Sequence, residues 1–272
     1  MSWSDRVAIV TGASSGIGLA AARAFVKRGA RVALVARTET TLARLVRELG
    51  ERAASFPLDV TDHAGLRALP GRVVDRFGRL DVVVNNAGVN HRGEVADRTA
   101  AELEQIVDTN LVAPMLLSHA ALPHLRDGGV IVNVASLAGK VAVPHEAAYS
   151  ASKAGLRAFS RALGVELSAR GVRVCCVNPG PVDTGFFADI DKVPDLVFSQ
   201  PMSSAEQIAD AVVRAVESSA REIDVPAVSG KLATLAYLSP RLFAALRPIF
   251  EKRGARNKER YVASKRASRA VN

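Results

Sequence analysis

Short apolar runs alternate along the chain with longer segments whose apolar residues recur every three or four positions. The short runs contain Val, Ile and Ala almost without interruption, which is typical of strands buried on both faces of a parallel sheet. Seven strands are predicted, at Val7–Val10, Arg31–Ala36, Ala53–Pro57, Leu80–Val84, Val130–Ala135, Val172–Val177 and Glu222–Val225. The longer segments predict helices at Gly18–Arg28, Thr40–Gly50, Asp62–Phe77, Ala100–Leu125, Tyr149–Arg170 and Ala205–Ser218.

The order of these elements, strand then helix then strand, predicts an α/β fold. We expect a Rossmann-like, doubly wound parallel sheet of about seven strands with helices on both faces. No linker or internal repeat appears before residue 180, so residues 1–225 are predicted to form a single domain. The pattern changes after Pro226, and residues 226–272 are predicted to form a C-terminal helical extension.

The composition is that of a globular protein, with 49% hydrophobic and 23% charged residues. No uncharged apolar stretch reaches the roughly 18 residues of a membrane span, and the N-terminus shows no secretory leader. The adjacent Cys175 and Cys176 would point to opposite faces of a strand, which disfavours a disulfide between them. These features predict a cytoplasmic protein. The five histidines show no metal-ligand spacing, so no metal is expected.

A glycine-rich loop follows the first predicted strand and opens the first helix. Its sequence is Thr11-Gly12-Ala13-Ser14-Ser15-Gly16-Ile17-Gly18. Glycines allow a sharp turn and a close approach of the backbone to a pyrophosphate, to which the helix N-terminus offers free N–H groups. The order of strand, glycines and helix predicts a dinucleotide site, with a tight turn that binds no ligand as the alternative.

The residue type at the end of the second strand indicates whether the site prefers NAD or NADP. NAD-selective sites place an acidic side chain here for the ribose 2′-OH, whereas this chain has Ala36 and then Arg37. Because arginine suits a 2′-phosphate, the pattern predicts NADP(H) over NAD(H), with a solvated arginine at a helix start as the alternative. Asp59, after the third strand, could bond an adenine amino group or cap the next helix, although Thr61 and Asp62 are nearer to that cap.

A serine, a tyrosine and a lysine form the candidate catalytic set. Tyr149 and Lys153 lie four residues apart at the start of a helix, so both project from one face. A nearby ammonium lowers the pKa of a phenol from about 10, which makes it a usable acid or base near neutral pH. Ser136 ends the fifth strand, at the edge where such sheets bind ligands, and its hydroxyl can hold a substrate oxygen.

Taken together, these motifs resemble the short-chain dehydrogenase/reductase family in its short single-domain form. The matching segments appear in the family's order and cover about residues 5–225. They are Thr11–Gly18, Asp59, Asn85-Asn86-Ala87-Gly88, Asn110, Ser136, Tyr149, Lys153 and Pro179-Gly180-Pro181-Val182-Asp183-Thr184. The resemblance implies an NAD(P)-dependent oxidoreductase acting on CH–OH and C=O groups, with a small-molecule carbonyl or alcohol as its substrate.

The resemblance also implies a role for each matching residue. Ser136 would orient the carbonyl, Tyr149 would give or take its proton, and Lys153 would bond the nicotinamide ribose. Asn110 would hold a water in a proton relay, with a buried amide that fixes a kink at Pro114 as the structural alternative. The cofactor contacts would come from Gly12, Ser14, Ser15, Gly16, Ile17, Gly18, Arg37, Asp59, Val60, Asn86, Ala87, Gly88, Tyr149, Lys153, Pro179, Gly180, Val182 and Thr184.

Substrate contacts are expected from Asn90–Gly93, from Leu137–Glu146 and from Gly185–Pro201, which would be a mobile lid. The side chains expected to touch the substrate are Ser136, Val143, His145, Tyr149, Phe186 and Phe187. Because this set is mostly apolar, a hydrophobic ketone or alcohol is predicted. The alternative function is a non-catalytic NADP-binding sensor or scaffold, although binding alone does not need the serine, tyrosine and lysine.

A homodimer or homotetramer is expected, because members of the family commonly pair two long helices. Those helices are here predicted at Ala100–Leu125 and Tyr149–Arg170. Ala154, Ala158 and Ala162 are small enough for the helices to approach closely.

The C-terminal extension carries most of the charge. The net charge is +9, and the residues from Arg247 onward hold nine Lys or Arg and two Glu, a net of +7, which leaves +2 for the rest. A nearly neutral body argues against nucleic-acid binding. The segment Leu232–Phe250 predicts an amphipathic helix broken at Pro240 and Pro248. Its apolar face either packs near the substrate entrance or a partner subunit, with the basic end solvated, or makes a peripheral contact with an anionic membrane.

Overall fold

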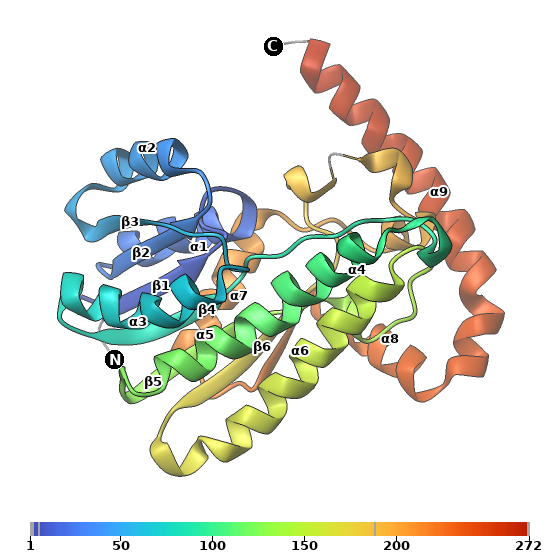
Figure 1. Ribbon diagram of the computed structural model, residues 1–272. Helices are drawn as coiled ribbons and strands as arrows, with labels where there is room; N and C mark the ends of the chain where they lie inside the picture. The colour runs from blue at the N-terminus through green and yellow to red at the C-terminus, as the bar shows by residue number, and fades with distance from the viewer. Residues whose placement is uncertain (1–2, 5, 188, 271–272) are drawn as a thin grey trace.

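The seven predicted strands form one parallel sheet in the order β3-β2-β1-β4-β5-β6-β7 (Figure 1). The computed structural model describes residues 3–4, 6–187 and 189–270. The strands are β1 (Val7–Thr11), β2 (Arg31–Ala36), β3 (Ala53–Pro57), β4 (Leu80–Asn85), β5 (Leu125–Val134), β6 (Arg173–Pro179) and β7 (Glu222–Val225). The order reverses between β1 and β4, and the carboxyl ends of the strands at such a point form a crevice for ligands. The predicted doubly wound α/β fold is confirmed.

The described residues form helices α1 (Gly16–Lys27), α2 (Glu39–Leu49), α3 (His63–Phe77), α4 (Ala100–Val107), α5 (Ala113–Ala121), α6 (Ala147–Glu166), α7 (Ala205–Glu217), α8 (Ala227–Leu238) and α9 (Pro240–Ala270). Six of these helices cover the two faces of the sheet. Helices α1, α2 and α7 pack on one face, and α3, α5 and α6 pack on the other. In β1, Ala8 and Val10 join the first layer, whereas Val7 and Ile9 join the second. This alternation explains why the strand needs apolar residues at every position.

The predicted helix Ala100–Leu125 is wrong in its extent and regularity. Helix α4 continues through a π-helical turn at Asp108–Val112 into α5, which ends at Ala121. Pro123 follows closely, and a proline has no N–H with which to continue a helix. Leu125 instead begins β5 and pairs with β4. Such π-helical turns are often found at functional sites, and this one places Asn110 at the edge of the sheet.

Beyond β7 the chain forms two helices rather than the three short pieces implied by its prolines. Pro240 separates α8 from α9 as predicted, but the predicted break at Pro248 is wrong, because Pro248 lies inside α9. Helix α9 packs against the short helical turn Asp195–Ser199, and tertiary packing can outweigh the cost of a proline inside a helix. Helix α9 lies along one side of the molecule, and its last turns project away from the body (Figure 1). None of the described helices combines the length and the apolar composition needed to cross a membrane.

Candidate active site

The glycine loop turns tightly around the N-terminus of α1. Gly12 and Gly16 have φ angles of +66° and +52°, a region that strains any residue with a side chain. A Cβ on Gly12 would lie only 2.9 Å from the Asn86 side-chain nitrogen, so the two loops are in close contact. Ser15 is the N-cap of α1, and its side chain accepts no hydrogen bond from the helix. The first N–H groups of α1 are therefore available to bind a phosphate.

Gly18 has a packing role in the loop, and its predicted contact with the cofactor stays a prediction. It does not line the cavity beside the loop. A Cβ at this position would collide with the backbone oxygen of Gly12 and lie 2.6 Å from the Asn86 side-chain nitrogen. Only glycine lets α1 approach the loop this closely, and the loop shape depends on that approach.

A cavity of about 360 Å³ runs along the carboxyl edge of the sheet from the glycine loop to Tyr149 and Lys153. All the other predicted cofactor residues line it. Thr184 lies beside the glycine loop, since its methyl carbon is 3.3 Å from the position of a Cβ on Gly16. Sequence motifs did not indicate several further lining residues, which include Val35, Leu58, Val89, Gln105, Thr109 and Ala135. The two left-handed glycines, the uncapped helix and the elongated cavity fit a dinucleotide.

The positively charged side chain of Arg37 lies at the β2 end of this cavity. It is exposed there, directly after the buried Ala36. Asp59 is the one acid among the described residues that line the cavity, and its carboxylate accepts hydrogen bonds from the Thr61 N–H at 3.0 Å and hydroxyl at 2.8 Å. Asp62 caps α3 by accepting from a backbone N–H in its first turn, so helix capping is not the role of Asp59.

Asn110 fixes the loop after β4. It is fully buried; its oxygen accepts from the Val89 N–H at 2.9 Å, and its nitrogen donates to the Val89 oxygen at 2.9 Å and to the Ser152 hydroxyl at 3.1 Å. Both amide donors are therefore used within the protein. The side chain positions the neighbouring Gly88 beside Lys153, rather than fixing a kink at Pro114. Its predicted role in holding a water stays a prediction.

Ser136, Tyr149 and Lys153 come together at the carboxyl edge of the sheet. Lys153 is 4% exposed, and its Nζ donates to the backbone oxygen of Val134 at 3.0 Å and lies 5.8 Å from the centre of the Tyr149 ring. The Ser136 hydroxyl accepts from the Ala138 N–H at 3.1 Å and donates to the backbone oxygen of Pro179 at 3.4 Å, and its interaction with the Tyr149 phenol lowers the pKa of that phenol. The three side chains therefore surround one point where a substrate oxygen can bind.

Burial controls the proton affinity of these groups. It raises the pKa of Tyr149, and the Glu146 carboxylate raises it further, whereas the Ser136 hydrogen bond and Arg92 lower it. Burial also lowers the pKa of Lys153 to about 8. The expected net lowering of the tyrosine pKa is therefore not met, because burial of the phenol outweighs the favourable groups around it. At neutral pH Tyr149 is protonated and able to donate, while Lys153 is charged.

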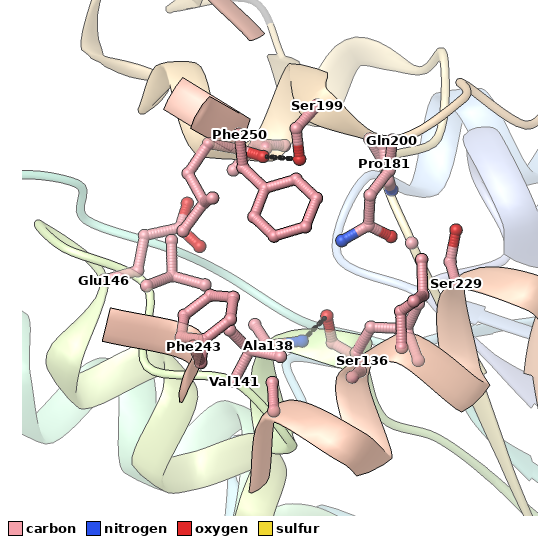
Figure 2. Close-up of a pocket in the computed structure, with 18 of the residues that line it drawn as sticks. Ser136, Ala138, Val141, Glu146, Pro181, Ser199, Gln200, Ser229, Phe243 and Phe250 are labelled. Carbon is pink, nitrogen blue, oxygen red and sulfur yellow. Dashed lines mark hydrogen bonds between the residues drawn. The ribbon is translucent and has the colours of Figure 1, made fainter. Parts of the chain in front are cut away.

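A second cavity, of about 430 Å³, opens beyond Tyr149 (Figure 2). Tyr149, Gly180, Phe186 and Phe187 line both cavities, so the two meet at the tyrosine. Of the predicted substrate contacts, all but His145 line this second cavity. His145 is exposed and has a φ of +62°, and its backbone oxygen accepts a hydrogen bond from the Gly93 N–H. Its contact with the substrate stays a prediction, although its side chain does not line this cavity.

Arg92 is a buried cation in the cavity wall that sequence reasoning did not single out. Its Nε donates to Glu146 at 2.8 Å, and another nitrogen donates to the backbone oxygen of Phe186 at 3.0 Å. The guanidinium lies 5.0 Å and 5.1 Å from the ring centres of Phe186 and Phe187. Since Glu146 immediately precedes α6, Arg92 joins the helix that carries Tyr149 to the loop after β6.

The C-terminal extension supplies one wall of the second cavity. Helices α8 and α9 contribute mostly apolar side chains: Val228, Leu232, Ala233, Leu235, Leu242, Phe243, Leu246 and Phe250. Phe243 and Phe250 also stack on each other, with ring centres 6.2 Å apart. The extension therefore packs beside the cavity, as one of the two sequence interpretations proposed.

Close contacts fasten α9 to the loop after β6. A Cβ on Gly254 would collide with the backbone oxygen of Asp195, so the helix lies directly on that loop. Asn257 donates to the backbone oxygen of Phe198 at 2.9 Å, and Lys258 lies 3.4 Å from the Asp195 carboxylate. The basic end of the helix thus binds the body of the protein as well as facing solvent.

Two further residues of α9 reach the segment that follows β6. The Tyr261 hydroxyl donates to the Asp183 carboxylate at 2.6 Å, and Lys265 donates to its other oxygen at 2.8 Å. Although burial opposes them, these hydrogen bonds lower the pKa of Asp183. Asp183 lies between Val182 and Thr184, which both line the cofactor cavity, so α9 is linked to both sites.

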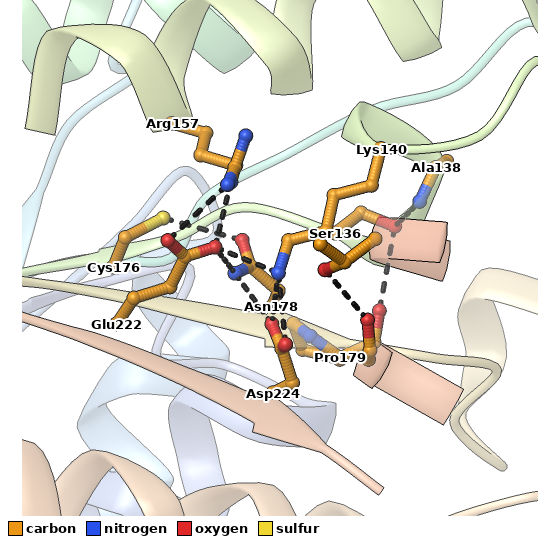
Figure 3. A network of polar contacts seen from close by, with 11 residues as sticks. Ser136, Ala138, Lys140, Arg157, Cys176, Asn178, Pro179, Glu222 and Asp224 are labelled. Atoms are coloured by element: carbon orange, nitrogen blue, oxygen red, sulfur yellow. Dashed lines mark hydrogen bonds and ion pairs between the residues drawn. The ribbon is translucent and has the colours of Figure 1, made fainter. Parts of the chain in front are cut away.

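A partly buried ionic network supports the turn that holds the serine (Figure 3). Lys140, just beyond that turn, lies 2.8 Å from both Asp224 and Glu222 of β7. Asn178 of β6 donates to the same two acids at 2.9 Å and 2.8 Å, and Arg157 of α6 donates to Glu222 at 2.6 Å. Burial opposes them, but these hydrogen bonds lower the pKa of Glu222 to about 2. The network ties the serine turn to β6, β7 and α6.

A dinucleotide cavity that meets an apolar cavity at a buried tyrosine defines a nicotinamide-dependent oxidoreductase. The family model described as short chain dehydrogenase matches residues 6–194. The chain belongs to this family, the short-chain dehydrogenases/reductases, which act on CH–OH and C=O groups.

Relatives include the ketoacyl reductase HetN of Nostoc sp., which is 39% identical over 81% of this chain and 78% of its own length. The cis-4-hydroxycyclohexanecarboxylate dehydrogenase of Sinomonas cyclohexanicum is 36% identical over 77% of this chain and 88% of its own. The L-fucose dehydrogenase of Mus musculus is 37% identical over 69% of each chain. The predicted family and class of enzyme are confirmed.

Proposed function

We propose that the chain transfers a hydride between NADP(H) and the carbonyl or secondary alcohol carbon of a hydrophobic substrate. The observation that carries the proposal is the position of Tyr149, which lines both cavities beside Lys153 and Ser136. Bound nicotinamide would supply or accept the hydride. Residues 1–225 would form the cofactor-binding and catalytic part, and residues 226–272 would extend the substrate site.

The side chains would handle the proton and the substrate oxygen. Ser136 would orient the oxygen by hydrogen bonding, and Tyr149 would donate its proton to it during reduction. The Lys153 ammonium would stabilise the resulting phenolate, and it would also hold the nicotinamide ribose. In the oxidation direction the same groups would act in reverse, with Tyr149 receiving the proton.

A preference for NADP over NAD is supported by Arg37. The arginine is exposed in the cofactor cavity and follows the small Ala36, and it forms no ion pair with an acid in the described part of the chain. A charge-assisted hydrogen bond to a 2′-phosphate is worth about 1.5–3 kcal/mol, which corresponds to roughly 10- to 100-fold in affinity.

A hydrophobic substrate is supported by the walls of the second cavity. Val141, Val143, Phe186 and Phe187 face it from the body, and α8 and α9 close it with further apolar side chains. The names of the relatives do not identify one substrate class, because they refer to three different kinds of compound: ketoacyl groups, hydroxycyclohexanecarboxylate and fucose.

The test is a panel of apolar ketones and secondary alcohols assayed with NADPH, NADP⁺, NADH and NAD⁺. We expect turnover of at least one apolar ketone, with the NADP pair favoured. NADP(H) binding without turnover of any carbonyl or alcohol would instead support the non-catalytic sensor or scaffold.

We further propose a homodimer or homotetramer formed through α4, α5 and α6. Ala154, Ala158 and Ala162 are exposed along α6, and the larger apolar Val165 and Met115 are exposed nearby in these helices. Exposed small residues let helices pack closely against a second copy. Light scattering at working concentration would give a dimer or tetramer mass, and a monomer mass would refute the proposal.

We also propose that the protein is cytoplasmic and that its C-terminal extension makes a peripheral contact with an anionic membrane. Val228, Leu232, Leu238 and Ile249 are exposed on α8 and α9, beside the substrate cavity, and Lys231 is exposed among them. Burial of apolar side chains and attraction of basic ones both favour anionic lipid.

Vesicle sedimentation tests this contact. Full-length protein should pellet with anionic vesicles and be released by salt, and Leu238→Glu should reduce pelleting. Leu238 does not line the cavity, so this variant leaves the substrate site intact. Protein that stays in the supernatant with anionic lipid at low salt would contradict the proposal.

A further inference from the structure

One side of the substrate cavity carries two polar groups without protein partners. The side-chain oxygen of Gln200 is buried and has no hydrogen-bond partner in the described part of the chain. Ser229 is only 5% exposed, and its hydroxyl bonds none of the described residues. Both residues line the cavity, and Figure 2 shows the Gln200 amide pointing into it, with Ser229 on the same side.

The other buried polar groups of the cavity wall are already engaged. Arg92 and Glu146 pair with each other, and the Ser199 hydroxyl donates to the backbone oxygen of Leu196 at 2.7 Å. Ser239 and Arg253 also line the cavity, but Ser239 is only partly buried and Arg253 is exposed. The serine and tyrosine of the catalytic set face the reacting oxygen. The Gln200 oxygen and the Ser229 hydroxyl are therefore the buried groups that can recognise a second polar feature of a ligand.

Gln200 lies at the end of the cavity that adjoins the cofactor site. Its side-chain oxygen is 3.3 Å from the position of a Cβ on Gly180. Gly180 lines both cavities, so this oxygen lies near their junction. A substrate whose carbonyl reaches Tyr149 would pass close to it.

We propose that Gln200 and Ser229 form a second polar anchor, which binds a hydroxyl group of the substrate in addition to the reacting carbonyl. The proposal rests on the proposed function and names its substrate class, an apolar ketone or alcohol that carries a further hydroxyl. An amide oxygen can only accept a hydrogen bond, so it requires a donor from the ligand. A hydroxyl donates one hydrogen bond and accepts another, and the Ser229 hydroxyl can supply the second.

The physical basis is the cost of a buried polar atom without a partner. A ligand that lacks the hydroxyl would cover the Gln200 oxygen with apolar surface and leave it unsatisfied. A ligand with the hydroxyl would satisfy it. Sites built in this way reject the analogue that lacks the polar group more strongly than apolar pockets distinguish size.

Matched pairs of ketones provide the test. Each pair shares one carbon skeleton and differs by a single hydroxyl, and several skeletons that fill the cavity are compared. Affinities are measured by calorimetry on full-length Tyr149→Phe protein loaded with NADPH, so that turnover does not consume the ligand. In at least one pair, the hydroxylated ketone should bind about tenfold tighter or more. The absence of such a pair would overturn the anchor.

Variants then assign the preference to these residues. Gln200→Leu should bring the affinity ratio of the best pair towards one, and Ser229→Ala should reduce it. Ser199→Ala is the matched control, because Ser199 lines the same cavity but its hydroxyl already donates to the Leu196 oxygen, so the ratio should stay unchanged. Gln200→Met removes the amide oxygen with a side chain of similar size, and it should also bring the affinity ratio towards one. Thermal unfolding of each variant will show whether it is folded, so that a change in the ratio is not assigned to misfolding.

The outcomes separate the two proposals. An unchanged ratio in folded Gln200→Leu or Gln200→Met protein would overturn the anchor and leave the proposed function intact. No turnover of either ketone of any pair by the unmodified protein would count against the proposed function, whereas the binding ratio would still decide on the anchor.

Discussion

The cofactor cavity and the substrate cavity are built by different kinds of sequence. The cofactor cavity consists of turns that follow strands β1 to β6, where short motifs set the backbone shape. The substrate cavity takes a whole wall from α8 and α9, beyond the residues 6–194 that the family model matches. The comparison teaches that a site made of backbone turns can be recognised in sequence, whereas a site made of packed side chains depends on where distant helices dock.

The largest effect should come from the residue that the two cavities share. Tyr149→Phe removes the proton donor but keeps the ring, so kcat should fall by about 10²-fold or more while cofactor affinity is retained. Steady-state rates and calorimetric cofactor binding measure the two quantities separately. A variant with nearly full turnover would rule out Tyr149 as the acid.

A change at the β2 end of the cofactor cavity should affect that cavity alone. Arg37→Ala should weaken NADP binding by roughly 10- to 100-fold and leave NAD binding almost unchanged, because only NADP carries the 2′-phosphate. Arg44→Ala is the control, since Arg44 is exposed on α2 outside the cavity. Equal losses for the two cofactors would show that Arg37 does not contact the phosphate.

The complementary change lies in α9. Gly254→Leu would force the helix away from Asp195, and the apolar wall that α9 supplies would move with it. We expect KM for an apolar ketone to rise about tenfold, which corresponds to about 1.4 kcal/mol, with a smaller loss of cofactor affinity, because α9 reaches the cofactor cavity only through its contacts with Asp183. Ring contacts connect this helix to the active site through Tyr149, Phe186, Phe187, Phe198 and Tyr261.

Lys252→Leu is the matched control, because it places the same side chain on the exposed side of α9. Its KM should match that of the unmodified protein. If Gly254→Leu weakened cofactor and substrate binding equally, the separation of the two cavities would be wrong.

Hydrogen exchange over Gly185–Pro201 in the same variant would show whether that segment is the mobile lid expected from the sequence.

The smallest predicted effect is a shift in pH dependence. Burial lowers the pKa of Lys153 to about 8, so the ammonium is present below that pH and is lost as the pH rises through it. Carbonyl reduction should decline in the same range, because the neutral amine no longer stabilises the tyrosine phenolate. Lys153→Arg keeps the charge and should move the decline to higher pH. A decline at the same pH in the arginine variant would assign it to another group.

The sequence predicted the elements that repeat a simple pattern. The strands follow from short, nearly uninterrupted apolar runs, and the Tyr149–Lys153 pair follows from helical spacing, so the sheet and the main catalytic contacts could be expected. Gly18 lay inside a motif, but its role depends on how closely α1 approaches Gly12, which no spacing reveals. The left-handed backbone at His145, whose side chain does not line the cavity, is likewise not revealed by any spacing.

Other features depend on contacts between distant residues. Arg92 becomes a buried part of the cavity wall only because Glu146, 54 residues later, pairs with it. Pro248 predicted a helix break, but packing of α9 on Asp195–Ser199 keeps the helix continuous. The polar pair Gln200 and Ser229 belongs to two segments with no shared motif. Such features come from tertiary packing, which sequence periodicity does not encode.

The central claim is that a hydride passes directly between nicotinamide and the substrate carbon, with Tyr149 supplying the proton. The most direct test is reduction of an apolar ketone with NADPH that carries deuterium at the transferable position. We predict that deuterium appears on the carbinol carbon of the product, one per molecule, and that the hydroxyl hydrogen comes from solvent. Product without deuterium on that carbon, or no product with any carbonyl tested, would contradict the claim.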